Sequence, residues 1–242
     1  MSTNPLTVQQ AIERGLRATV LPLRFIMVFT IVGVILLSVV KFSWWDFLLI
    51  PAGLLVAILY TTYAAQKWRM WAYGHVAGIH QLQRSAELAG ILTRQTYDQI
   101  PFFLSCAQKN TLKVLQKRFS DEPAFVDDYS IPPETKVFSK SLFGSSDTPV
   151  LTISESSIDI HPLEVFEWEQ ITNERISRTT YSKDWGTVDG IAPSGSRDFF
   201  RFEYVTQHFE TFMSTLDIAV WKLDLLLYIY RGRFEAKRAA VG

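Results

Sequence analysis

The chain has 242 residues, of which 48% are hydrophobic and 20% are charged, and its 24 basic side chains balance its 24 acidic ones. A balanced charge argues against a nucleic-acid partner, which requires a basic surface. Cys106 is the only cysteine, which excludes a disulfide framework and favours a reducing compartment. The mean hydropathy of +0.10 is too low for a chain that crosses a membrane throughout, so we expect a small apolar part and a larger polar part.

Residues 1–24 form an amphipathic N-terminal segment. Thr7 and Gln10 have the spacing of a capping box, which begins a helix by pairing its first free amides with side chains. Behind them, apolar residues recur at helical spacing. The pattern fits a helix along the inner leaflet of a membrane and equally a helix docked on the rest of the protein.

Residues 25–65 are expected to form a transmembrane helical hairpin. Two runs without a charged side chain, residues 25–40 and 47–65, each approach the roughly 20 residues that cross about 30 Å of hydrocarbon. A buried core helix is the alternative interpretation. The first run follows a polar stretch and no small-residue cleavage site comes after it, so we expect a retained anchor and not a signal peptide.

Basic and tryptophan residues flank both runs, as is typical of residues at the membrane interface. More of the basic ones lie before the first run and after the second than in the short turn between them. This bias predicts two spans with both termini in the cytoplasm. The expected interface residues are Arg14, Arg17, Arg24, Lys41, Trp44, Trp45, Lys67, Trp68, Arg69 and Trp71.

Inside the two runs, the polar residues are limited to serine and threonine. The absence of an ionisable side chain argues against an ion path or a proton relay. Gly33 and Gly53 are expected to allow close packing of the helices, with each other or with partner helices.

Residues 66–119 are expected to form a juxtamembrane helical segment in the cytoplasm, with helices at about 76–92 and 101–119. An acidic, proline-containing linker follows at residues 120–135. The lysines of the second helix are expected to be a solvated face, with a contact to anionic lipid as the alternative.

Residues 136–242 are expected to form an antiparallel β domain. Six short strands are predicted from period-two patterns between 137 and 204, and an amphipathic helix is predicted from about Thr206 to the end. Trp168 is expected to lie in the core, whereas the position of Trp185 is left open.

Three sequences carry a resemblance to a known family: NPLTVQQAIERGL near the start, LTISESSIDI and FEWEQI. Short strands followed by one C-terminal helix resemble a bacterial pleckstrin-homology-like (PH-like) domain. The order of hairpin and domain is similar to the membrane-anchored YcxB-like family, although the helices between 76 and 119 depart from that family's shorter link. The resemblance implies an interaction module anchored in the bacterial inner (cytoplasmic) membrane, associated in some cases with regulation or with immunity against toxins, and no catalytic residues.

No ligand chemistry is evident in the sequence. The turn at residues 142–148 lacks the cations that hold inositol phosphates, and only Lys136 and Lys140 precede it, so no specific phosphoinositide is expected. The four histidines do not have zinc-site spacing, and phosphate loops and nucleophile elbows are absent. We therefore expect no enzyme activity, no cofactor and no metal.

The prediction is an α+β membrane protein with a two-helix transmembrane hairpin, a cytoplasmic helical segment and a PH-like antiparallel β domain with a C-terminal helix. The expected function is non-enzymatic: the anchored cytoplasmic domain binds a protein partner, as an immunity or regulatory factor. The alternative is a structural or scaffolding subunit of a larger bacterial membrane complex. The expected partners are the lipid bilayer and another protein, and the hairpin also allows a homo-oligomer.

Overall fold

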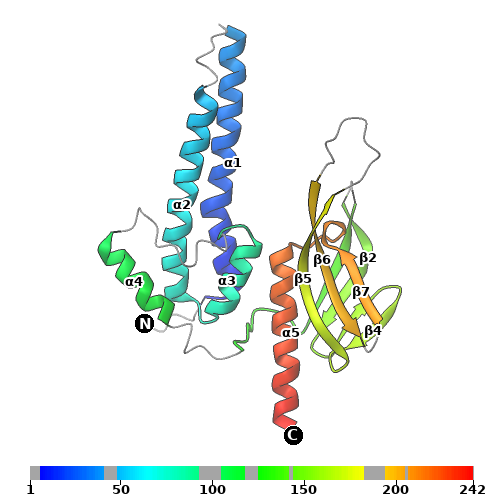
Figure 1. Ribbon diagram of the computed structural model, residues 1–242. Coiled ribbons are helices and arrows are strands. Elements are labelled where there is room, and N and C mark those ends of the chain that lie inside the picture. Colours follow the sequence, from blue (N-terminus) through cyan, green and yellow to red (C-terminus); the bar gives the residue numbers. More distant parts are fainter. Residues whose placement is uncertain are drawn as a thin grey trace. The chain divides into compact units, whose positions relative to one another are not determined.

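A computed structural model describes residues 6–40, 48–92, 105–117, 125–141, 144–182, 194–204 and 207–241. The chain divides into two compact units, Met1–Ala124 and Phe125–Gly242. In the described residues, the first unit is helical, whereas the second consists of antiparallel strands and a long C-terminal helix (Figure 1). The protein is therefore α+β, as predicted.

The first helix, α1, extends over Val8–Val40 and contains 33 residues. The predicted capping box precedes it, because the Gln10 amide donates to Thr7 Oγ1 at 3.2 Å and the Thr7 amide donates to Gln10 Oε1 at 3.4 Å. No break separates the predicted N-terminal segment from the first apolar run. At 1.5 Å per residue, α1 is about 50 Å long, more than the hydrocarbon of a bilayer requires.

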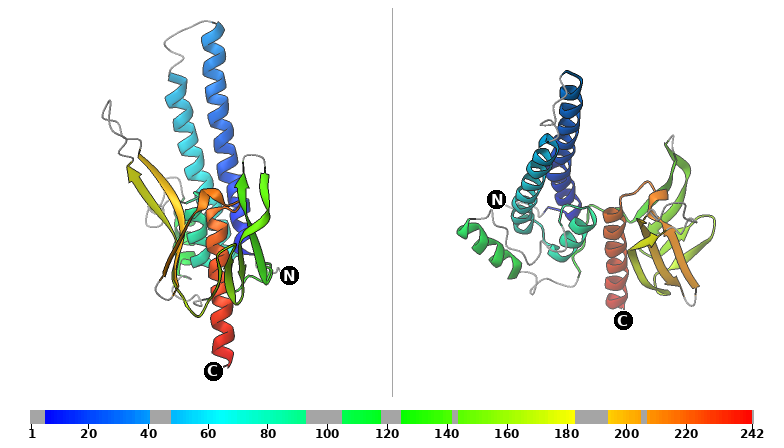
Figure 2. Two further views of the ribbon diagram at one scale, coloured as in Figure 1. Left: turned by 90° about the vertical axis from the view of Figure 1, so that its right-hand side faces the viewer. Right: turned by 45° about the horizontal axis from the view of Figure 1, so that its top comes forward.

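The second helix, α2 (Leu49–His75), lies antiparallel to α1, and the two remain side by side in both views of Figure 2. Their contacts follow the antiparallel order, because the residue numbers on α1 fall from Thr30 through Ala18 to Ala11 while those on α2 rise from Gly53 through Tyr60 to Trp68. Beyond these, Arg14 contacts Trp71, and the amide of Leu6, just before α1, donates to the His75 carbonyl.

Two shorter helices complete the described part of the first unit. Helix α3 (Ile79–Leu88) packs against α1 and buries Ile79 and Leu82. Helix α4 (Cys106–Lys117) contacts α2. It begins with a second capping box formed by Ser105 and Gln108, whose reciprocal bonds measure 3.0 and 3.3 Å. Its predicted beginning near residue 101 lies outside the described residues.

The second unit contains a four-stranded and a three-stranded antiparallel sheet. Their strand orders, β1-β2-β3-β4 and β5-β6-β7, follow the sequence, so each sheet is a meander. The strands are β1 (Glu134–Ser141), β2 (Gly144–Ser154), β3 (Ser157–Ile160), β4 (Glu164–Glu167), β5 (Ile171–Ser182), β6 (Ser194–Tyr204) and β7 (Gln207–Phe212).

The core of the second unit contains side chains from both sheets and from the final helix, α5 (Val220–Val241). Trp168 is fully buried, as predicted, and its indole Nε1 donates to the Ser154 carbonyl at 2.8 Å. Leu223, Leu226 and Tyr230 of α5 are buried as well. The indole N–H therefore has a hydrogen-bond partner, and the apolar face of α5 is buried within its own unit.

The helix predicted from Thr206 begins later than expected. Residues 207–212 form β7, and a 3₁₀ helix, η3 (Met213–Thr215), separates this strand from α5. Phe209 stacks on Phe202 of the neighbouring strand with ring centroids 5.0 Å apart. Cross-strand aromatic pairing therefore favours a strand in a segment where phenylalanines also recur at helical spacing.

Candidate functional site

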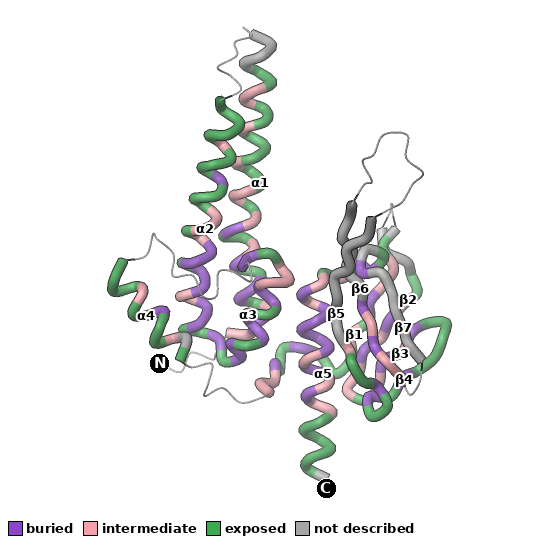
Figure 3. Tube along the Cα trace, viewed as in Figure 1, coloured by how far each residue is buried: buried purple, intermediate pink, exposed green. Residues whose placement is uncertain are grey.

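Helices α1 and α2 each have one half whose apolar side chains are exposed and one half that is packed against protein. From Leu21 to Leu36 and from Leu48 to Tyr63, most large apolar side chains are exposed, including Phe29 at 73%. Figure 3 shows this half of the pair largely in the exposed colour. Both helices are long and apolar enough to cross a membrane. An exposed apolar surface of this extent is rare in water-soluble monomers and indicates contact with lipid or with other protein.

The other halves of the same helices are packed against protein. Ala11 and Ile12 of α1 are buried, as are Trp68 and Tyr73 of α2. The Trp68 indole donates to the Ala11 carbonyl at 2.9 Å. The N-terminal segment is thus docked on the rest of its unit, the second of the two alternatives left open by the sequence.

The expected interface residues occupy different environments. Arg14, Arg17, Arg24 and Lys67 are exposed. Trp71 is half-buried, and the Arg14 guanidinium lies 4.0 Å above its ring.

Two of the expected interface residues are covered by protein. Trp68 is 4% exposed and Arg69 only 1%, so neither presents its side chain to headgroups. The Arg69 Nε donates to the Tyr73 hydroxyl at 3.1 Å, and that hydroxyl donates to Gln83 Oε1 at 3.1 Å. The buried guanidinium is thus part of a hydrogen-bonded chain that runs through Tyr73 to Gln83. Lys41, Trp44 and Trp45 lie outside the described residues.

The two glycines expected at helix contacts differ. A β-carbon on Gly53 would lie 2.4 Å from Thr30 Oγ1, so only glycine permits this approach of α2 to α1. A β-carbon on Gly33 would meet no described atom within 4 Å. Of the two, only Gly53 lies at the contact between α1 and α2.

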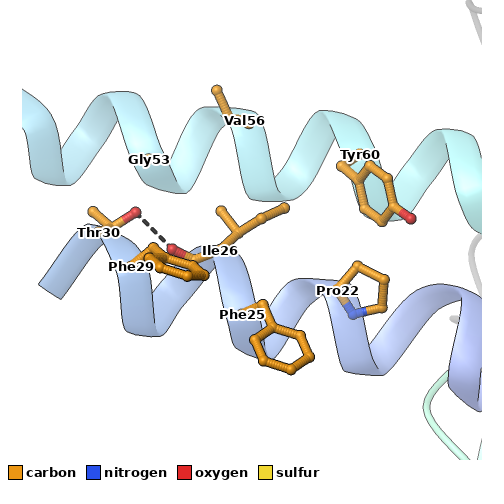
Figure 4. A pocket seen from close by; sticks show the side chains of 8 residues that line it. All are labelled: Pro22, Phe25, Ile26, Phe29, Thr30, Gly53, Val56 and Tyr60. Carbon is orange, nitrogen blue, oxygen red and sulfur yellow. Dashed lines mark hydrogen bonds between the residues drawn. The ribbon is translucent and has the colours of Figure 1, made fainter. Parts of the chain in front are cut away.

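Beside that contact, an apolar groove of about 720 Å³ lies between the exposed halves of α1 and α2. Figure 4 shows its lining, with Thr30 and Phe29 near Gly53 and with Pro22 near Tyr60. Phenylalanine, isoleucine, valine and proline side chains form most of the wall. The lining residues are Pro22, Phe25, Ile26, Phe29, Thr30, Gly53, Val56 and Tyr60.

Pro22 lies inside α1 and has no amide hydrogen, so it cannot bond the Ala18 carbonyl four residues earlier. The Tyr60 hydroxyl of α2 donates to this carbonyl at 3.2 Å. A carbonyl left without a partner in an apolar medium would cost several kcal/mol, so the bond from Tyr60 stabilises the helix pair where α1 is weakest.

In the second unit, Arg233 of α5 connects three segments. Its Nε donates to Asp127 Oδ1 at 2.8 Å, and its Nη1 lies 3.3 Å from Glu155 Oε1 in the turn between β2 and β3. Its Nη2 donates to the carbonyls of Asp128 and Ile131 at 2.9 and 3.1 Å. The guanidinium therefore uses its donors to hold residues 127–131 against the helix.

Phe125 fits against the same helix, because a β-carbon on Gly232 would lie 2.1 Å from its ring. The segment predicted as part of a linker, residues 120–135, is thus integrated into the second unit from Phe125 onward. Asp127 of this segment pairs with Arg233, which lies about 100 positions later and which no local pattern could connect to it.

Glu155 also bonds Lys237 Nζ. The hydrogen bond from Lys237, opposed by partial burial and supported by the charges of Lys237 and Arg233, lowers the pKa of the Glu155 carboxyl. Burial raises the pKa of the Tyr230 hydroxyl, which bonds Thr135 and donates to the Pro132 carbonyl at 2.8 Å. The bonds of both groups hold α5, between Tyr230 and Lys237, to the residues before β1 and to the turn after β2.

Two grooves flank this end of α5, with volumes of about 790 and 610 Å³. They share Pro133, Glu155 and Lys237. The larger also has Phe234 and Arg238 in its wall, and the smaller has Tyr129, which is 90% exposed. An exposed aromatic ring beside charged groups has the composition of a protein-binding surface.

Among the residues that the structure describes, no group of three or more histidine, cysteine, aspartate or glutamate side chains could hold a metal ion. His75 Nδ1 lies 2.7 Å from the carbonyl of Trp71 in its own helix, and Cys106 is exposed near the beginning of α4.

Comparison of the chain with protein-family models, with curated proteins and with solved structures found no match.

Sequence reasoning did not identify the functions of Tyr60 and Arg233. A proline inside an apolar helix was a usable signal for Tyr60, since it leaves one carbonyl in need of a donor from elsewhere. Arg233 offered no such signal, because its partners come from a loop and a turn that only the folded sheets bring to α5.

Proposed function

We propose that this protein is anchored in the bacterial inner membrane by α1 and α2 and that its second unit binds a protein partner without catalysing a reaction. The observation that carries the proposal is the exposed apolar half of the helix pair, from Leu21 to Leu36 and from Leu48 to Tyr63. In water, this surface would be unfavourable by about 25 cal/mol per Å² of apolar area, whereas lipid removes that cost.

The proposed orientation places both chain termini in the cytoplasm. The exposed cations Arg14, Arg17, Arg24 and Lys67 support it, since each lies in the packed half of its helix or within about one turn of it. The second unit then faces the cytoplasm, where it serves as a regulatory or immunity factor. Its order of four strands, three strands and a C-terminal helix supports a PH-like assignment.

The grooves beside α5 supply the surface for the partner. Tyr129 and Phe234 provide rings, and Lys237 and Arg238 provide charge at the rim. Because the carboxylate of Glu155 is bonded to Lys237 and Arg233, the surface is preorganised and a partner does not have to order it.

Membrane anchoring is tested by washing vesicles that contain the full-length chain with alkaline carbonate. We expect the protein to stay in the pellet, and an external protease should leave residues 125–242 intact in whole cells. Release by carbonate, or loss of those residues to the protease, would contradict the proposal.

Partner binding is tested by purifying the full-length protein in mild detergent with Tyr129→Ala and Phe234→Ala as a paired variant. We expect one soluble partner to copurify with the wild type and to be lost from the variant. A stoichiometric set of membrane proteins retained by both forms would instead identify a scaffolding subunit. Lys109→Gln, on α4 of the first unit, is the matched control.

A further inference from the structure

We infer that the groove between α1 and α2, together with Arg14 and Lys67, binds one anionic phospholipid. An acyl chain would occupy the groove and the phosphate would lie between the two cations. This inference rests on the proposed membrane anchoring and adds to it a specific ligand class.

The groove suits an apolar ligand and not water. Its lining has two hydroxyl groups, and both donate their hydrogen to the protein backbone. Thr30 Oγ1 donates to the Ile26 carbonyl at 2.8 Å, as drawn in Figure 4, and the Tyr60 hydroxyl donates to the Ala18 carbonyl at 3.2 Å. A water molecule needs two to four polar partners, and this lining does not provide them.

The length of the groove matches one leaflet. From Pro22 to Thr30 the helix rises about 12 Å, and half of the hydrocarbon core of a bilayer is about 15 Å thick. Gly53 keeps the floor free of a side chain, while Phe25 and Phe29 form its wall. An acyl chain can therefore enter sideways from the bilayer and lie along the helix pair.

Two cations continue the same face of the pair beyond the groove. Four-residue steps lead from Pro22 through Ala18 to Arg14, and a step of seven leads from Tyr60 to Lys67. The Arg14 guanidinium lies 4.0 Å above Trp71, which follows Lys67 by one helical turn, so the two cations lie about one turn apart along the pair.

The direction of Lys67 favours a headgroup at this level. Side chains on a helix lean toward its N-terminus, which for α2 is the end that contains Gly53. We therefore expect the Lys67 side chain to lean along α2 toward the groove. Its backbone position lies about 10 Å along the helix from Tyr60, at a depth suited to a lipid phosphate.

The local charge favours an anionic ligand over a zwitterionic one. The described residues between Leu6 and Leu92 contain six arginines and lysines and two acids. Of the acids, Glu13 accepts a bond from Gln9 at 2.9 Å and Glu87 one from Gln83 at 3.2 Å. Neither lies on the face that carries Arg14 and Lys67.

The test is native mass spectrometry of the full-length protein released from nanodiscs with equal amounts of phosphatidylglycerol and phosphatidylcholine. We expect the wild type to retain one phosphatidylglycerol. The double variant Arg14→Gln, Lys67→Gln should retain it at least tenfold less. Arg17→Gln with Arg24→Gln is the matched control, because it removes the same charge from positions of α1 that are turned about 140° and 160° away from the groove residue Pro22. It should change retention less than twofold.

A second variant, Val56→Trp, fills the groove and leaves both cations in place, and it should lower phosphatidylglycerol retention by a similar factor. Equal retention of the two lipids by the wild type, or an equal loss in the control pair, would overturn the inference. Carbonate washing of the same proteins separates the two claims. A wild type that is washed out refutes anchoring, whereas one that stays but shows no preference refutes only the lipid site.

Discussion

The exposed half of the α1–α2 pair and the helix α5 are both rich in apolar side chains, yet they satisfy them in different ways. Leu223, Leu226 and Tyr230 of α5 are covered by the sheets of their own unit, whereas Phe29 and its neighbours have no cover among the described residues. The second unit thus supplies its own apolar medium. The helix pair needs one from outside, and this difference separates a folded core from a candidate membrane anchor.

The largest expected effect comes from placing a charge in the covered helix. Leu226→Arg would bury an unpaired guanidinium at a position that is 3% exposed, so we expect the second unit to lose more than about 4 kcal/mol and to unfold. Near-UV circular dichroism of the full-length protein in detergent should show this loss. Leu226→Met is the control, and a native spectrum for Leu226→Arg would contradict the comparison.

The same substitution in the helix pair should act on insertion instead of folding. Val32 is 44% exposed, so Val32→Arg should disfavour insertion by about 3 kcal/mol at the centre of a span. The carbonate-resistant fraction should fall, while Val32→Leu should behave as the wild type. If Val32→Arg left that fraction unchanged, the exposed half would not be a lipid-facing surface.

Arg233 tests whether polar contacts hold α5 as firmly as apolar ones do. Arg233→Met removes the ion pair of Asp127 and leaves Glu155 with Lys237 alone, and we expect a loss of about 2 kcal/mol in the unfolding free energy of the second unit. Arg238→Met should change it by less than about 0.5 kcal/mol, because that pair with Glu169 is exposed. Denaturant titration followed by tryptophan fluorescence measures both losses. Equal losses would contradict a stabilising role for the contacts of Arg233.

Tyr60 tests whether a hydrogen bond between α1 and α2 stabilises the helix pair. Tyr60→Phe keeps the ring but leaves the Ala18 carbonyl without its donor, at an expected cost of about 1 kcal/mol. The melting temperature in detergent should fall by a few degrees. Tyr63→Phe, a 52% exposed position one turn away, should leave it unchanged. A larger fall for Tyr63→Phe would show that the hydroxyl of Tyr60 does not bridge the helices.

The smallest effect concerns pH. The pKa of Glu155 is lowered in the folded state, so its stabilising contribution is present above the ordinary glutamate value of about 4.3 and is lost as the pH falls below it. Glu155→Gln should flatten the acid limb of the stability curve below the ordinary glutamate pKa of about 4.3. An unchanged acid limb would mean that the bonds with Lys237 and Arg233 are too exposed to contribute.

Tyr230 works in the opposite direction. Because its pKa is raised, its contribution is complete below the ordinary tyrosine value of about 10 and is lost only as the pH rises above it. Tyr230 therefore contributes no pH dependence in the range where Glu155 titrates, and the two limbs can be measured in one titration.

Several elements followed from the sequence because their signals are local. The capping box at Thr7 and Gln10, the two apolar runs, the six predicted strand positions and the burial of Trp168 each depend on spacing within a few residues. The start of α5 did not follow, because Phe209 has helical spacing to later residues and pairs across a sheet with Phe202.

The sequence by itself determined that two long apolar helices precede an antiparallel β unit and a final helix, since hydrophobic period and charge-free length are properties of the chain alone. Only the tertiary structure decided which parts of those helices are covered by protein, which donor serves the Ala18 carbonyl, and that residues 125–133 belong to the second unit. These outcomes depend on side chains that are distant in sequence, and their contact energies exist only after the helices and sheets have packed.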